Sequence, residues 1–188
     1  MALNITGDAD ADALLDQSPF ALLLGMLLDQ QVPMETAFSG PAKLRDRLGS
    51  LDPAGIAALD PDELLAAMKQ PPAVHRFPGS MGARVQTLAA AIVSDWEGDT
   101  AAIWTSGDPD GAEVLRRLRA LPGFGEQKAK IFLALLGKQR GLAAPGLREA
   151  AGDYGAAGHR SVADIVDAES LRKVREHKRA AKAAAKKG

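Results

Sequence analysis

The chain has 188 residues, of which 46% are apolar and only 4% aromatic, so leucine and alanine must supply most of any core. It contains no cysteine, which excludes disulfides, iron–sulfur clusters and thiolate metal sites. The net charge of −1 hides an asymmetry, because residues 1–170 carry 15 basic and 23 acidic side chains, whereas residues 171–188 carry eight and one. This C-terminal stretch is typical of a tail that binds a polyanion, although a solvated, disordered end has the same composition.

The N-terminal region lacks the basic start and apolar run of a signal peptide. The longest apolar stretch, Phe20 to Leu28, is too short to cross a membrane as a helix. We therefore expect a cytoplasmic protein with no membrane contact, located at the nucleoid if it binds DNA.

Helical periodicity dominates the first half of the chain. Helices are predicted from Ser18 to Gln31, from Pro41 to Leu48 and from Pro61 to Gln70, with each proline in a favourable first-turn position or close to it and Asp60 as a cap. Glycine and proline clusters separate these segments.

Three apolar stripes at helical spacing follow in the second half, and we interpret them as core faces. They are Val85-Leu88-Ala89-Ile92-Trp96, then Val114-Leu115-Leu118-Leu121, then Ala129-Phe132-Leu133-Leu136. No segment shows sustained apolar and polar alternation. The fold class is therefore predicted to be all-α, a helical bundle with short connections.

A hairpin lies between the last two stripes, with the sequence Leu121-Pro122-Gly123-Phe124-Gly125. Two glycines at this spacing allow a tight turn that points amide groups outward. Because a helix follows, its unpaired first-turn amides and positive dipole end favour phosphate, and Lys128 and Lys130 add charge nearby. An ordinary helical hairpin closed by glycines is the alternative.

This segment resembles the DNA-binding hairpin shared by endonuclease III, the adenine mismatch glycosylase, the oxidised-guanine glycosylases and the alkylpurine glycosylases, that is, the helix-hairpin-helix (HhH-GPD) base-excision repair superfamily. Two further segments carry the resemblance: Phe20 to Leu28 running into Asp29-Gln30-Gln31, and Arg84 to Ile92, which is similar to the family's central helix. The resemblance extends from about Phe20 to Gly141.

The resemblance implies a glycosylase-like bundle in two lobes. We expect a six-helix domain over residues 20–140, a small helical lobe from residues 1–19 with 141–170, and a basic tail over residues 171–188. It also implies DNA-binding roles for Gln30, Gln31, the hairpin residues 121–125, Gln127, Lys128 and Lys130. Gln31 falls on the glutamine that fills the hole left by an extruded base, which suits an amide able to donate and accept at once. The alternative is that Gln30 and Gln31 only satisfy backbone groups at a helix end.

The chain departs from the family at both catalytic positions. The position of the nucleophilic lysine holds Gln127, and Lys128 is one residue, or about 100° of helix rotation, away, so we expect no lyase activity. The position of the catalytic aspartate falls on Pro145, followed by Gly146. The nearest acids, Glu149 and Asp153, are candidate catalytic residues if the preceding loop is rearranged, or else are solvated helix-end acids.

No cofactor is expected beyond a monovalent cation in the hairpin, which the resemblance allows. His75, His159 and His177 are too scattered to form a metal site. Trp96 and Trp104 are interpreted as packing residues, and Phe77 or Met81 as either packing residues or wedges that enter the duplex.

The function predicted from these observations is damage recognition in base-excision repair, by a monomeric, monofunctional DNA N-glycosylase acting on double-stranded DNA. A non-catalytic lesion-binding or architectural protein of the same fold is the main alternative. A small accessory module that recruits another repair enzyme through its basic tail is a third.

Overall fold

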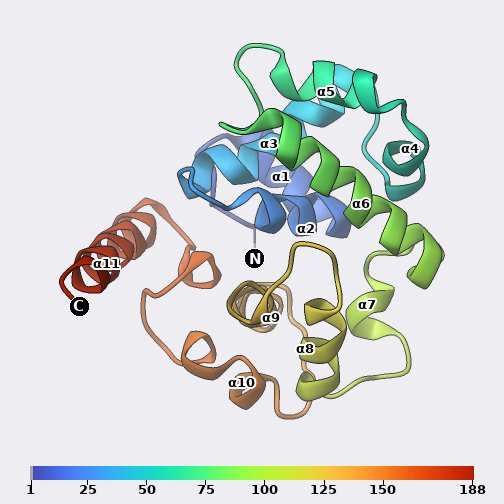
Figure 1. The fold of residues 1–188 in the computed structure, drawn as a ribbon. Helices are drawn as coiled ribbons and strands as arrows, with labels where there is room; N and C mark the ends of the chain where they lie inside the picture. Colours follow the sequence, from blue (N-terminus) through green and yellow to red (C-terminus); the bar gives the residue numbers. More distant parts are fainter. Residues whose placement is uncertain (1) are drawn as a thin grey trace.

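A computed structural model describes residues 2–188, and over these residues the chain forms helices and connections without a strand (Figure 1). The predicted all-α class is therefore confirmed. The elements in chain order are α1 (Ala9–Gln17), α2 (Pro19–Leu28), α3 (Met34–Leu48), α4 (Pro53–Ala58), α5 (Pro61–Lys69), α6 (Pro78–Trp96), α7 (Ala102–Thr105), α8 (Gly111–Arg119), α9 (Glu126–Gln139), α10 (Leu147–Ala150), the 3₁₀ helices η1 (Gly152–Gly155) and η2 (Val162–Asp164), and α11 (Ala168–Lys186).

Helix α2 lies at the centre of the core, and every residue from Phe20 to Leu28 is buried. It packs against α1, α3, α6 and α9. The prediction that this helix reaches Gln31 is wrong, because it ends at Leu28. The amide of Gln30 bonds the carbonyl of Leu28 at 2.7 Å, and Gln31 has a positive φ of 58°, so residues 29–31 form a turn.

The predicted start of the next helix at Pro41 is also wrong. Helix α3 begins at Met34 and Pro41 lies inside it, where the ring removes one backbone donor. The buried residues of α3 keep helical spacing across the proline, as Met34, Ala37, Phe38, Pro41 and Leu44 show. Packing of this continuous apolar face against α2 outweighs the local cost of the proline.

The helices form two groups that meet at the centre (Figure 1). Helices α1 to α6 pack on one another, with α6 against α4 and α5 and with α3 against α1 and α2. Helices α8, α9 and α10 pack together with η1 and η2. The N-terminal segment reaches the second group through an ion pair of Arg140 with Asp16 at 2.6 Å and a bond from Asn4 to the carbonyl of Val166.

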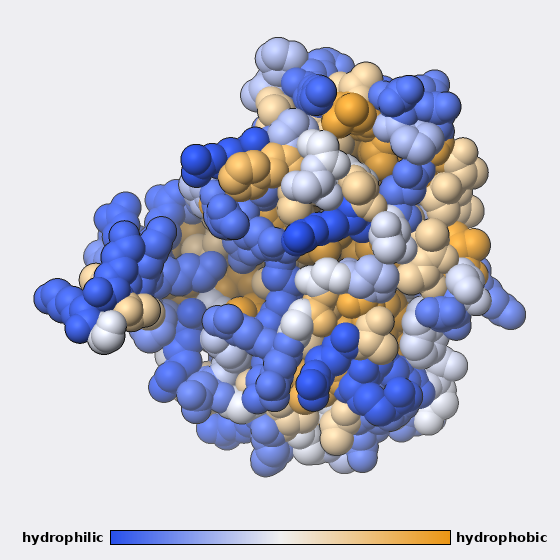
Figure 2. Space-filling view, viewed as in Figure 1, coloured by the Kyte–Doolittle hydropathy of each residue, from blue (hydrophilic) through white to orange (hydrophobic). Residues whose placement is uncertain are grey.

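The basic C-terminal stretch is part of helix α11, which starts ahead of the expected boundary at Leu171. Asp167 caps it by accepting a bond from the amide of Ser170 at 2.7 Å. Val174 is fully buried in the core, whereas most of the rest of the helix is exposed and hydrophilic (Figure 2). An alanine- and lysine-rich sequence thus docks as a helix on the body through Val174 and the partly buried Leu171.

Candidate DNA-binding and base-extrusion site

The hairpin between α8 and α9 is anchored by its two large apolar residues. Leu121 and Phe124 are buried, and Phe124 packs edge-on against Phe132 at 6.3 Å between ring centroids. Gly123 and Gly125 are exposed between these anchors, and Gly123 adopts a left-handed φ of 84°. The turn therefore presents backbone to solvent while its side chains hold it in place.

The N-terminus of α9 is free to bind an anion. Gly125 provides no side-chain cap, and the first intramolecular bond of the helix is from the amide of Ala129 to the carbonyl of Gly125. The amides of residues 126–128 thus have no partner among the described residues, and the helix dipole adds to their attraction for phosphate. Glu126 in this first turn is paired with Lys130 at 3.2 Å, which lowers the pKa of the Glu126 carboxyl.

The hairpin carbonyls are the candidate ligands of the monovalent cation expected from the sequence. Among the described residues, the carbonyls of Pro122, Gly123 and Phe124 accept no bond, so they are the groups that would hold such an ion. Its charge would favour a phosphate beside the turn.

The turn after α2 is held by side chains from other elements. His75 accepts a bond from the amide of Phe77 at Nδ1, so its Nε2 carries the proton and donates to the carbonyls of Leu28 at 3.1 Å and Gln30 at 2.9 Å. Arg84 of α6 donates to the amide oxygen of Gln30 at 3.0 Å. Gln31 itself is exposed and projects from a rigidly bonded turn.

The hairpin packs on the last turn of α2, and α9 bonds the start of the turn that follows α2. A Cβ on Gly123 would lie 2.5 Å from Cδ1 of Leu27, the penultimate residue of α2. Lys128 of α9 extends its Nζ to the carbonyls of Leu27 at 3.1 Å and Asp29 at 3.4 Å. Burial lowers the pKa of Lys128 from its usual 10.5 to about 8, and Arg84 and Lys178 act in the same direction against the favourable charge of Asp29.

Lys128 is therefore turned inward in this structure, and its role in DNA binding stays a prediction. It caps carbonyls at the end of α2, where cations are favoured. A solvent-facing cation near the hairpin is Arg119 at the end of α8, which is exposed and acts on Glu126. The sequence signal for Arg119 was the basic last turn of α8, just before the hairpin.

The loop before α6 places Phe77 on the surface close to the turn of residues 29–31, called the plug turn because Gln31 is the expected plug. Phe77 is 41% exposed, lies two residues after His75, and carries the guanidinium of Arg76 5.3 Å above its ring. Met81 is buried, so it cannot serve as a wedge in this conformation. Trp104 packs edge-on against Phe132, in agreement with the packing role predicted for it.

The two positions that hold catalytic residues in the family, Gln127 and Pro145 here, are engaged in hydrogen bonds within the protein. Gln127 donates to the hydroxyl of Tyr154 at 2.9 Å, and the carbonyl of Pro145 accepts the amide of Gly111 at 2.7 Å. Glu149 and Asp153 are both exposed, and neither side chain has a hydrogen-bond or ion-pair partner among the described residues. Glu149 lines a cavity of about 350 Å³ that is formed mainly by residues around the end of α9 and by α10.

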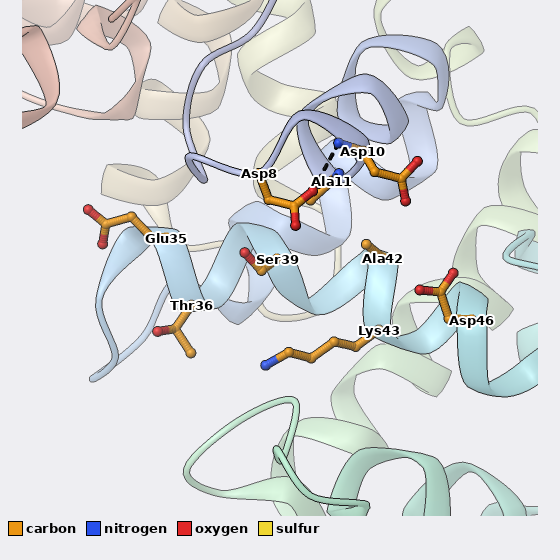
Figure 3. Close-up of a pocket in the computed structure, with 9 residues that line it drawn as sticks. All are labelled: Asp8, Asp10, Ala11, Glu35, Thr36, Ser39, Ala42, Lys43 and Asp46. Carbon is orange, nitrogen blue, oxygen red and sulfur yellow. Dashed lines mark hydrogen bonds between the residues drawn. The ribbon is translucent and has the colours of Figure 1, made fainter. Parts of the chain in front are cut away.

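The cavity shown in Figure 3, of about 400 Å³, lies between α3 and the start of α1. Its charged lining consists of Asp8, Asp10, Glu35, Asp46 and one cation, Lys43. Asp8 is already used as the cap of α1 (Figure 3). An excess of carboxylates repels phosphate, so this cavity is not part of the DNA-binding face.

Helix α11 pairs two of its cations with acids next to the plug turn. Arg175 contacts Glu35, and Nζ of Lys178 lies 3.6 Å from Oδ2 of Asp29. The sequence showed the basic stretch but not these partners, which lie more than a hundred residues earlier in the chain.

Within residues 2–188, no group of three or more histidine, aspartate or glutamate side chains is arranged to hold a metal ion. No single helix in this range is long and apolar enough to cross a membrane; α1 and α2 together have the length and composition of a span, but they meet at a bend of 116°.

The geometry thus combines an exposed glycine hairpin at the start of α9 with a glutamine-bearing turn at the end of the buried helix α2. The model of the HhH-GPD superfamily of base excision DNA repair proteins matches residues 24–187, so the chain belongs to this family. Membership makes it a DNA-binding protein of base-excision repair. No curated protein matches the sequence.

Proposed function

We propose that the protein is a monofunctional DNA N-glycosylase that extrudes a damaged base from double-stranded DNA and fills the gap with Gln31. The observation that carries the proposal is that the hairpin and the start of α9 lie against the end of α2 and the turn after it, through Gly123 on Leu27 and Lys128 on two carbonyls. A phosphate held at the hairpin fixes the nucleotide that lies against Gln31.

The conformation of Gln31 supports its assignment as the plug. A left-handed backbone costs a residue with a side chain roughly 1 to 2 kcal/mol, and here it is imposed on an exposed side chain with no intramolecular partner among the described residues. The bonds from His75, Arg84 and Lys128 hold this turn, so the exposed amide of Gln31 is kept in a fixed place. An amide in this position can pair with the orphaned base on the opposite strand.

The absence of a suitable amine supports a single reaction. Gln127 occupies the family's nucleophile position and bonds Tyr154, while Lys128 is committed to carbonyls at the end of α2. Cleavage of the base–sugar bond without strand cleavage is the expected outcome.

Base release from 5′-labelled duplexes carrying uracil, an alkylated purine or an oxidised purine tests the proposal, with alkaline cleavage used to reveal abasic sites. Gln31→Ala should weaken binding to an abasic duplex by roughly tenfold, the value of a hydrogen bond or two. Gln17→Ala, which removes an exposed glutamine at the end of α1, is the matched control.

A non-catalytic lesion-binding protein is the second candidate, favoured by Pro145 and by the exposure of Glu149 and Asp153. Tight, Gln31-dependent binding to damaged duplexes without release of any base would establish this candidate and reject the first.

A further inference from the structure

The carboxyl group of Asp29, the first residue after α2, is buried beside charged side chains of α9, α11 and α3. Asp29 is the C-cap of α2, and its side chain is only 10% exposed. Its cationic neighbours are Lys178 of α11 and Lys128 of α9, and Glu35 adds a like charge nearby. Burial is the largest effect on this group and raises its pKa, against the opposing influence of both lysines.

The helix end itself does not account for an aspartate in this place. A negative charge at the C-terminus of a helix opposes the helix dipole, and burial next to Glu35 adds to the cost. Its carboxylate accepts no backbone amide, in contrast to Asp8, Asp52 and Asp110, which cap helices. The two lysines offset this cost, so the turn after α2 holds a buried carboxylate between two cations, an arrangement that marks candidate functional groups.

The place of Asp29 relative to the plug suits an attack on the sugar. An extruded nucleotide stays tied to its two phosphates, so its sugar carbon C1′ cannot move far from the position that Gln31 fills. Asp29 is two residues from Gln31 and on the same rigid turn. Glu149 and Asp153 lie on the elements after α9, in solvent.

We propose that Asp29 is the catalytic carboxylate of this protein and takes over the task of the aspartate that Pro145 replaces in the chain. This inference rests on the proposed function. The base leaves with the electron pair of the C1′–N bond, a water oxygen forms the new bond to C1′, and the carboxylate of Asp29 takes a proton from that water. The departing base acquires a proton, so that one water is consumed overall. Burial makes the carboxylate a stronger base and leaves its charge little screened as the sugar becomes cationic.

Lys178 is the group that covers the carboxylate. It is 41% exposed and ends a flexible side chain, so it can move from Asp29 to a DNA phosphate when the duplex binds. This exchange would free the carboxylate at the moment the nucleotide arrives.

A charged transition-state mimic tests the inference independently of turnover. The full-length protein is titrated with two duplexes, one carrying a cationic pyrrolidine in place of the target sugar and one carrying a neutral tetrahydrofuran. Wild type should bind the cationic duplex at least about tenfold more tightly, since hydrogen bonds to charged groups are worth about 1.5–3 kcal/mol. Asp29→Asn should abolish this preference while it keeps affinity for the neutral duplex. Glu149→Gln and Asp153→Asn are the controls and should leave it intact.

The outcomes separate this inference from the proposed function. Equal affinity of wild type for both duplexes, or a preference that disappears in Glu149→Gln or Asp153→Asn instead, overturns the assignment of Asp29. If wild type prefers the cationic duplex, loses this preference in Asp29→Asn and releases no base, glycosylase activity on those lesions is rejected. The position of Asp29 beside the sugar is supported in that case. If base is released, Asp29→Asn should lower the single-turnover rate by roughly a hundredfold or more.

Discussion

The two hairpin glycines should respond differently to the same substitution, because only Gly123 is packed. Gly123→Ala places a residue with a side chain at φ 84°, at a cost of roughly 1 to 2 kcal/mol. Its Cβ would also lie 2.5 Å from Cδ1 of the fully buried Leu27, and overpacking of this kind typically costs about 1–3 kcal/mol. Gly125 has an ordinary φ of −79° and no atom within 4 Å of an added Cβ.

The expected result is a loss of about 2–5 kcal/mol of folding stability in Gly123→Ala, and little change in Gly125→Ala. For a chain of this size each kcal/mol shifts the Tm by about 2–4 °C, so the first variant should melt at least roughly 4 °C lower. Both variants should bind duplex DNA about tenfold or more weakly, because the added methyl group obstructs phosphate approach. Gly125→Ala is thus the variant that isolates DNA binding from folding.

Thermal melts followed by circular dichroism, together with fluorescence anisotropy on a labelled duplex, measure both quantities. A Gly123→Ala protein as stable as wild type would refute the packing argument. Unchanged affinity in a fully folded Gly125→Ala protein would remove the hairpin from the interface.

Three other expectations concern charge and chemistry. The first experiment replaces the C-terminal cations that have no ion-pair partner among the described residues. If three of them touch phosphate, the slope of log affinity against log salt should fall by roughly 2 to 3, equally for damaged and intact duplexes. A tail that only aids solubility would leave the slope unaltered. The pKa of Lys128 is lowered to about 8 in the folded protein, so the unfolded chain binds more protons between about pH 8 and 10.5. The free energy of unfolding, measured with urea, should therefore rise with pH in this range. Lys128→Met should abolish this rise, and the control Lys69→Met should keep it. Borohydride should trap no adduct with abasic DNA, and an adduct that vanishes in Lys128→Ala would show that this lysine reaches the sugar. The cations to be replaced in the first experiment are Arg179, Lys182 and Lys186 of α11 and Lys187, which directly follows it.

The sequence by itself was enough for the fold class, the hairpin and the family, because each depends on local patterns. Apolar residues at helical spacing and glycines around a turn constrain the backbone over a few residues, and the buried stripes from Val85 to Ile92 and from Ala129 to Leu136 are the result. Local rules failed where packing was stronger, as at Pro41, which lies inside α3 because the apolar face of that helix continues across it.

Only the tertiary structure decided which charged side chains meet. Helix rotation along α9 predicts that the side chains of Gln127 and Lys128 point in different directions. It does not predict that Lys128 caps a carbonyl of α2 about a hundred residues away. In the same way Asp29 was visible as part of a glutamine-bearing turn, yet its burial comes from α9 and α11, which approach from distant parts of the chain. The environment of an ionisable group is the sum of contacts from all elements around it, and no spacing within one segment contains that sum.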